Sequence, residues 1–118
     1  MKVQQWDQFA DRLQDSLDAS GDGMPLDFVR QQIEDGKAQW HPFETVAIVT
    51  QILKRLTGDI CLIWLVAGTM AELPKYEDAI VAWAIEARCA ELRYAGRRGW
   101  LKMLPHWEEI ATVGRRRL

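Results

Sequence analysis

The sequence predicts a mixed α/β (α+β) domain in which helices flank a mixed, mostly antiparallel sheet. Apolar residues recur at helical spacing through the first third of the chain, and β-branched runs dominate the middle. An apolar strand is then followed by a long helical pattern and another strand. Because a strand–helix–strand unit normally forms a parallel crossover, we expect an antiparallel hairpin that leads into one parallel step.

Two helices are predicted first. The first covers residues 3–19, and its apolar residues fall on one stripe: Trp6, Phe9, Leu13 and Leu17. The second begins at Pro25, whose missing N–H is not needed in a first turn, and closes at Gly36. We predict a single domain over residues 1–118, in which the first helix, within residues 1–20, could be peripheral.

Three strands are expected next. Residues 38–40 read as a short strand, and Pro42 marks a turn or a sheet edge because proline cannot donate to a ladder. Residues 45–53 are rich in β-branched side chains. Residues 60–66 are apolar on both faces, which is typical of a central buried strand. The short polar turn between these last two strands predicts an antiparallel hairpin.

The second half of the chain predicts a long helix. Thr69 and Glu72 have capping-box spacing and should open this helix, which would run to about Ala90. The elements expected after it are a strand over residues 91–95, a short helix over 100–107 and a last strand over 110–113. The predicted order is therefore α-α-β-β-β-α-β-α-β.

Composition excludes several protein classes. The chain has 118 residues, 48% of them hydrophobic and 27% charged, which indicates a globular domain. Its longest apolar run, residues 60–67, is too short for a membrane span of roughly 20 residues, so no membrane role is expected. Cys61 and Cys89 lack partners at metal spacing and predict two buried free thiols in a reducing compartment, with a disulfide as the alternative.

The charge is divided between the two ends of the chain. Residues 1–36 hold eight acids and three bases, a balance of −5, while residues 87–118 hold eight bases and three acids, a balance of +5. The two ends could lie together and neutralise each other, or they could form a bipolar surface that docks on a charged partner.

From about residue 25 onward, this order of elements resembles the GNAT acetyltransferase superfamily. In that resemblance residues 60–67 are the central strand, residues 72–90 the long helix and residues 97–107 the short helix, with Trp107 at the closing aromatic position. The stretches GKAQWHPFETVAIVTQI (36–52) and GRRGW (96–100) resemble small GNAT-like proteins of tailed bacteriophages and prophages. The resemblance implies a virion component or assembly protein, located in the host cytoplasm or built into a virion.

GNAT enzymes bind the pyrophosphate of acetyl-CoA at the start of the long helix, on a Gly-rich loop with a basic or Gln residue. Here that segment offers only Gly68, and it carries an acid, Glu72, and a proline, Pro74. A carboxylate repels an anion and proline removes an N–H donor. We therefore expect no cofactor and no enzyme activity, and a structural or protein-interaction module. The alternative is a divergent N-acetyltransferase that binds acetyl-CoA through the GRRGW loop.

Candidate site residues follow from these interpretations. Arg97, Arg98 and Lys102 are candidates for an anion site, against the alternative of a solvated loop. Interface candidates are Trp6, Phe9, Arg115, Arg116 and Arg117. A protein partner, such as another virion protein, or a homo-oligomer is expected, whereas three terminal bases are too few to predict nucleic-acid binding.

Two further residue types complete the interpretation. His41 and His106 each neighbour a proline and are expected as exposed turn residues and not as metal ligands. Tyr94 is the phenol nearest the predicted short helix, and its favoured role is a sheet-face aromatic.

Overall fold

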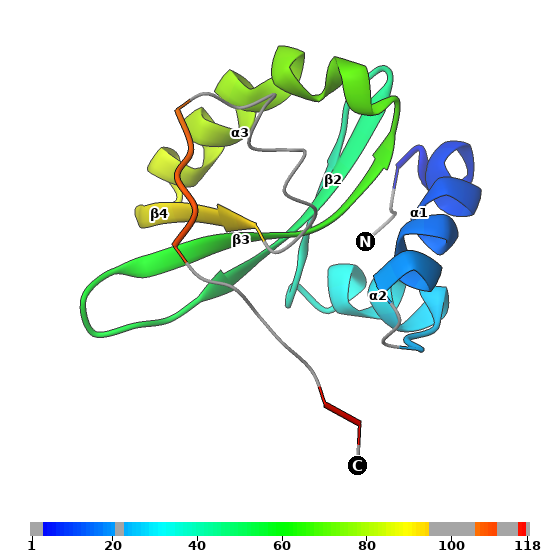
Figure 1. Cartoon of the computed structure of the whole chain (residues 1–118), viewed down its shortest axis with the longest axis horizontal. Coiled ribbons are helices and arrows are strands. Elements are labelled where there is room, and N and C mark those ends of the chain that lie inside the picture. Colours follow the sequence, from blue (N-terminus) through cyan, green and yellow to red (C-terminus); the bar gives the residue numbers. More distant parts are fainter. Residues whose placement is uncertain (1–3, 21–22, 95–105, 111–115, 118) are drawn as a thin grey trace.

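A computed structural model describes residues 4–20, 23–94, 106–110 and 116–117 of the chain. Within these residues a sheet is covered on one face by two helices and on the other by one (Figure 1). The elements are, in chain order, α1 (Trp6–Ser20), α2 (Leu26–Glu34), β1 (Gln39–Pro42), β2 (Val46–Leu53), β3 (Asp59–Gly68), the 3-10 turn η1 (Met70–Glu72), α3 (Leu73–Glu86) and β4 (Cys89–Tyr94).

The sheet has the predicted mixed topology. Its strands lie in the order β1-β2-β3-β4, with β1–β2 and β2–β3 antiparallel and β3–β4 parallel. The predicted fold class and the order α-α-β-β-β-α-β are therefore confirmed. Most of the predicted short helix (100–107) and last strand (110–113) lies outside the described residues, and residues 106–110 form neither helix nor strand.

Each face of the sheet belongs to its own core. The first core lies between the sheet and helices α1 and α2, and its strand residues are Ala47, Val49, Leu65 and Ala67. The second core lies between the sheet and α3, and its strand residues are Val46, Ile48, Ile63 and Val66. Because side chains alternate along a strand, β2 and β3 supply both cores. The prediction that residues 60–66 form a central strand buried on both faces is confirmed.

Helix α1 is part of the first core. Trp6 is 6% exposed and Phe9 is 1% exposed, and their ring centroids lie 5.2 and 6.2 Å from that of Trp40 on β1. The expectation that these two rings lie free for a partner is therefore corrected. The stripe covers the sheet, because aromatic burial against a strand face stabilises the helix more than exposure to water would.

The start of α3 differs from the expected capping box. The helix begins at Leu73 after the η1 turn, and its N-cap residue, Glu72, makes no side-chain capping hydrogen bond. Pro74 occupies the first turn, where its fixed φ is helical and its missing N–H costs nothing. The helix ends at Glu86, earlier than predicted, because Arg88 adopts a φ of 63° and turns the chain into β4.

No helix among the described residues combines the length and the apolar character needed to cross a bilayer.

Gly68, the last residue of β3, lies against the backbone at the start of β2. Its φ is 123°, and a Cβ at this position would lie 2.9 Å from the Cα of Val46 and still closer to the Thr45 carbonyl. This glycine therefore permits contact between two backbones.

We predict that Gly68→Ala lowers the free energy of unfolding by about 3 kcal/mol, measured by urea denaturation. The cause is a steric conflict with backbone atoms added to an unfavourable φ. The matched control is Gly36→Ala, where φ is 77° but no atom lies within 4 Å of the new Cβ. That control should lose only about 1 kcal/mol. Equal losses in the two variants would contradict the close-approach explanation.

Candidate functional site

The junction between β3 and α3 is the position where the GNAT resemblance expects an anion site. Here the Thr69 N–H donates to the Thr45 carbonyl at 3.2 Å, and the Glu72 N–H donates to the Thr69 carbonyl at 2.9 Å. Pro74 has no N–H, and the Glu72 carboxylate lies 3.8 Å from Lys75 Nζ. Two backbone donors of this junction are thus already bonded and Pro74 offers none, and the nearest charges are an acid and base pair.

The sheet opens beside this junction. Parallel pairing between β3 and β4 ends at Ile63 and Tyr94, whereas β3 continues to Gly68. Trp64 is an extra residue on β3, because Val49 pairs with Leu65 while the next residue of β2 pairs with Ile63. This bulge bends β3 where it leaves β4. Among the described strands, none pairs with the β4-side edge of β3 beyond Ile63.

Helix α1 reaches this open edge through one side chain. The Ser16 hydroxyl donates to the Val66 carbonyl at 2.8 Å in a half-buried position. The Thr69 N–H donates to the Thr45 carbonyl, so alternation along the antiparallel ladder directs the Val66 carbonyl away from β2 and into the open edge. An acceptor that would otherwise be free for a ligand is therefore bonded to the protein itself.

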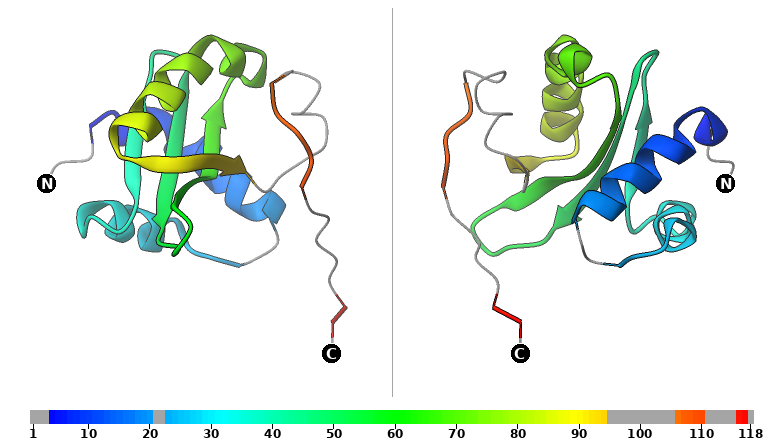
Figure 2. Two further views of the ribbon diagram at one scale, coloured as in Figure 1. Left: turned by 90° about the vertical axis from the view of Figure 1, so that its left-hand side faces the viewer. Right: turned by 45° about the vertical axis from the view of Figure 1, so that its right-hand side comes forward.

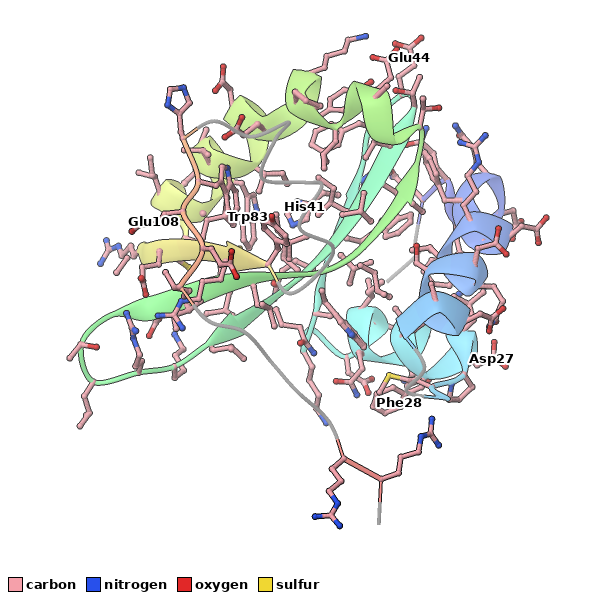
Figure 3. All side chains as sticks on the ribbon, in the orientation of Figure 1. Asp27, Phe28, His41, Glu44, Trp83 and Glu108 are labelled. Carbon is pink, nitrogen blue, oxygen red and sulfur yellow. The ribbon has the colours of Figure 1, made fainter. Side chains whose placement is uncertain are left out.

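A buried polar network lies on the α3 face of the sheet. His41 Nε2 is 2.9 Å from the Thr50 hydroxyl, which donates to Gln39 Oε1 at 3.0 Å. The Trp83 ring stands edge-on to the His41 ring at 4.6 Å, and Figure 3 shows the two side chains together between the sheet and α3. The expectation that His41 is an exposed turn residue is wrong, because the residue lies in strand β1 and faces the second core. His106 is exposed at a turn, as predicted.

Burial controls the charge of this network. It lowers the pKa of His41 from 6.5 to about 4, so the imidazole is neutral at physiological pH. The Cys61 thiol shares a side-chain hydrogen bond with Thr50, and burial, with a smaller contribution from Cys89, raises its pKa to about 11. Both cysteines are free, with Cys61 buried and Cys89 half-buried. A protonated thiol and a neutral histidine make this network a satisfied part of the core and not a nucleophile–base pair.

The second candidate is a shallow apolar recess between α3 and the sheet. Trp107 lies over it, donating from Nε1 to Glu77 Oε1 at 2.8 Å and packing 5.2 Å from the Tyr94 ring. The remaining lining is aliphatic: Ile48, Ile63, Leu73, Ile80 and Leu92. Burial, followed by the charge of Glu109, raises the pKa of Tyr94. Tyr94 is thus a sheet-face aromatic, as predicted, and the apolar walls do not suit a diphosphate.

The predicted anion-site residues Arg97, Arg98 and Lys102 lie outside the described residues, as does Arg115 of the interface candidates. Arg116 and Arg117 are described and exposed.

A basic pair lies beside β4, and one of its members, Arg93, is a residue that the sequence groups with Arg97, Arg98 and Lys102 as a possible anion site. Arg93 on β4 donates to Glu91 Oε2 at 2.8 Å, and Arg55 reaches the same oxygen at 2.7 Å. These two bases lower the pKa of Glu91, with the Arg93 hydrogen bond as the main cause. Both guanidinium groups are therefore already paired with a carboxylate of the chain.

Comparison with solved structures supports the fold. TTHA1254 from Thermus thermophilus matches in a mutant form with a TM-score of 0.66 and 15% identity, over 100% of this chain and 94% of that one. Its wild-type form gives 0.64 and 15%, over 100% and 93%. A possible acetyltransferase from Clostridium difficile 630 gives 0.56 and 10%, over 100% and 94%. No protein-family model matches the sequence, and no curated protein matches it.

The likeness to a possible acetyltransferase indicates a GNAT-like fold for this chain. At this level of identity the comparison concerns the fold alone, and function has to be argued from the residues.

We predict that the protein loses stability on acidification through His41. Because burial depresses the pKa of His41 to about 4, the stabilisation is complete above the unfolded value of 6.5 and is lost as the pH falls from 6.5 toward 4. The loss should be about 2 kcal/mol between pH 7 and pH 4.5, out of about 3 kcal/mol for the full shift. Urea denaturation from pH 7 to 4.5 measures it against His41→Gln, which can still donate to Thr50 but does not titrate. Identical pH slopes in the two proteins would contradict the prediction.

Proposed function

We propose that this chain is a structural or protein-interaction module on a GNAT-like frame that does not use acetyl-CoA. The observation that carries the proposal is the β3–α3 junction. There the Thr69 and Glu72 amides are bonded within the chain, Pro74 offers no donor and Glu72 places a carboxylate beside the helix start. An anion at this place would lose the amide donors and meet a like charge.

The hydrogen bond between Ser16 and Val66 at the open edge of β3 supports the same proposal. A ligand that used this edge as a strand would need its backbone acceptors, and the Val66 carbonyl already accepts from Ser16 at 2.8 Å. Displacing that hydroxyl would leave a half-buried donor without a partner, at a cost of about 1–3 kcal/mol. Since α1 is anchored by its whole apolar stripe, it does not easily withdraw from the edge.

The proposed partner is another virion protein, in the particle or during its assembly. A virion or assembly role rests on the resemblance of residues 36–52 and 96–100 to phage proteins, to which the comparisons add no support. Mass spectrometry of purified particles, if the gene lies among virion genes, would detect the chain in the virion and is the direct check of that role.

We predict that acetyl-CoA leaves the protein unchanged. A ligand at about 100 times its Kd stabilises the folded state by about 2.7 kcal/mol, which raises Tm by several degrees. Thermal unfolding with acetyl-CoA up to about 1 mM should therefore show no shift, and titration calorimetry should show no binding heat. An acetyltransferase of known acetyl-CoA affinity serves as the positive control. A clear shift in Tm together with a measurable Kd would remove the proposal.

A second candidate, a divergent acetyl-CoA-dependent N-acetyltransferase, is favoured by the β3 edge that lacks a strand partner beyond Ile63 among the described strands. In that candidate Arg97, Arg98 and Lys102 would hold the coenzyme phosphates, and the β3 backbone would hold the acyl group.

For that second candidate we expect turnover in an acetyl-CoA assay across a panel of amines, lowered at least about tenfold by Arg98→Ala because one phosphate contact is lost. Arg116→Ala, at an exposed arginine outside the predicted loop in the sequence, is the matched control and should keep full turnover. The absence of both turnover and bound coenzyme would end this candidate.

A further inference from the structure

We infer that Arg55 and Arg93 form a carboxylate-binding site, which takes one carboxylate group of a ligand beside the chain's own Glu91. The inference goes beyond the proposed function and does not rest on it, because the site lies at the hairpin end of β3 and the β3–α3 junction lies at the other end. Three observations carry it: an excess of positive charge, unused guanidinium donors, and a place on the sheet that α1 and α2 do not cover.

Two guanidinium groups converge on a single carboxylate oxygen. Arg55 Nη2 donates to Glu91 Oε2 at 2.7 Å, and Arg93 Nη2 donates to the same atom at 2.8 Å. The nearby Lys54 and Asp59 pair with each other at 2.8 Å and add no net charge. Among the described residues Glu91 is the one acid paired with either arginine, so the cluster keeps one positive charge in excess.

Both arginines also keep donors that the described residues do not use. A guanidinium has five N–H donors in a planar fork. Arg55 uses Nε on the Gly58 carbonyl, at 2.9 Å, and Nη2 on Glu91. Arg93 uses Nη2 on Glu91, whereas its Nε is buried and has no partner among the described residues. Because a buried donor without a partner is unfavourable, the cluster lacks an acceptor, and a carboxylate is the acceptor that a guanidinium binds best.

The chain holds the two arginines in place before a ligand binds. The Gly58 N–H donates to the Arg55 carbonyl at 3.2 Å, and Arg55 Nε donates back to the Gly58 carbonyl, so the side chain is bonded to its own turn. A Cβ on Gly58 would lie 2.6 Å from the Cβ of Ala90, which shows that this turn packs closely against β4. The turn and β4 thus position the two guanidinium groups together. Groups that are already positioned lose less freedom when a ligand binds.

The site lies on the α1 side of the sheet, beyond the part that α1 and α2 cover. Val49 belongs to the first core, and Gln51, two residues further along β2, faces the same side. Leu62 and Arg93 follow Gln51 in register across β3 and β4, so all three share that face. The described members of the first core do not include Leu62. In the right-hand view of Figure 2, the hairpin end of β2 and β3 projects beyond both helices.

This place combines access from solvent with an apolar neighbour. The side chains of Arg55 and Arg93 are 35% and 34% exposed, so a ligand can reach them. Ile60, which is in register with Glu91, is only 5% exposed. Charge-assisted hydrogen bonds are stronger beside apolar surface than in open water.

The size of the charge excess selects a carboxylate over a phosphate. A carboxylate carries one negative charge and neutralises the cluster. A phosphate monoester carries about −1.5 to −2 at pH 7, so its second charge would lie close to the ionised Glu91. The carboxylate can belong to a free acid or to an acidic side chain of a partner protein, and the experiment distinguishes these sources.

NMR titration of the isotope-labelled full chain with succinate, at pH 7 and low ionic strength, tests the inference. We expect the Nε–Hε signals of Arg55 and Arg93 to shift together, with a Kd below about 10 mM. A four-residue glutamate peptide is the second probe. Tighter binding of the peptide assigns the carboxylate to an acidic partner segment, and tighter binding of succinate assigns it to a free acid. Glycerol 2-phosphate places a similar total charge on one group and should bind at least about threefold more weakly than succinate.

Charge variants separate a binding site from an ion network that is only structural. Arg55→Gln and Arg93→Gln should each raise the succinate Kd at least about fivefold, because each removes one guanidinium group. Glu91→Gln should lower the Kd at least about threefold, since the amide oxygen still accepts from both arginines and no longer repels the ligand. Arg30→Gln is the matched control: Arg30 on α2 is 44% exposed and pairs singly with Glu34 at 3.3 Å, so the Kd should not change.

The spectra also report whether each variant is folded, and Arg55→Gln, on an exposed turn, keeps the test available if Arg93→Gln does not fold. Four results would each overturn the inference. They are no shift at either arginine with about 50 mM of both carboxylate probes, an unchanged Kd in Arg55→Gln, a Kd that Glu91→Gln does not lower, and tighter binding of glycerol 2-phosphate than of succinate.

Discussion

Strand β3 has to bury both of its faces, and most of the structure follows from that requirement. A strand of apolar residues on both sides cannot remain at the surface of a two-layer protein, so helices must lie above and below it. Helices α1 and α2 meet the side of Leu65 and Ala67, and α3 meets the side of Ile63 and Val66. The parallel return of the chain into β4 then follows from α3 crossing over the sheet.

The elements that the sequence specifies locally were predictable. Each of these elements has a local sequence pattern that predicts its secondary structure. The patterns are the apolar stripe of α1, the β-branched run of β2 and the two-sided apolar run of β3. Pro42 correctly marked an edge, since β1 lies at the end of the strand order. The capping box at Thr69 and Glu72 was wrong because a 3-10 turn and Pro74 open the helix instead, and residue spacing alone does not distinguish these two starts.

Features that depend on residues far apart in the sequence were not predictable. Trp6 was read as a docking residue because an aromatic at a chain end fits an interface and a core equally well. Its burial depends on Trp40, which only the folded chain brings beside it. The same holds for His41, where the neighbouring proline suggested a turn while the bond to Thr50 requires the pairing of β1 with β2. The candidate coenzyme site was predictable only in part. Glu72 and Pro74 are identified from the sequence, whereas the hydrogen bond from Ser16 to Val66 requires the folded chain.

The bond from Ser16 to Val66 bears on how the chain acquires its structure during synthesis. Its two residues are 50 positions apart, and the first core likewise joins α1 to strands that are translated later. A growing chain that has not yet released β3 therefore lacks the central strand surface that covers the apolar side of its first helix. Domains generally fold as units, so an N-terminal helix whose core partners come later does not complete its folding alone. Here the earliest segment must wait, and the aspartates along its other side keep it hydrated and repel neighbouring chains in the interval.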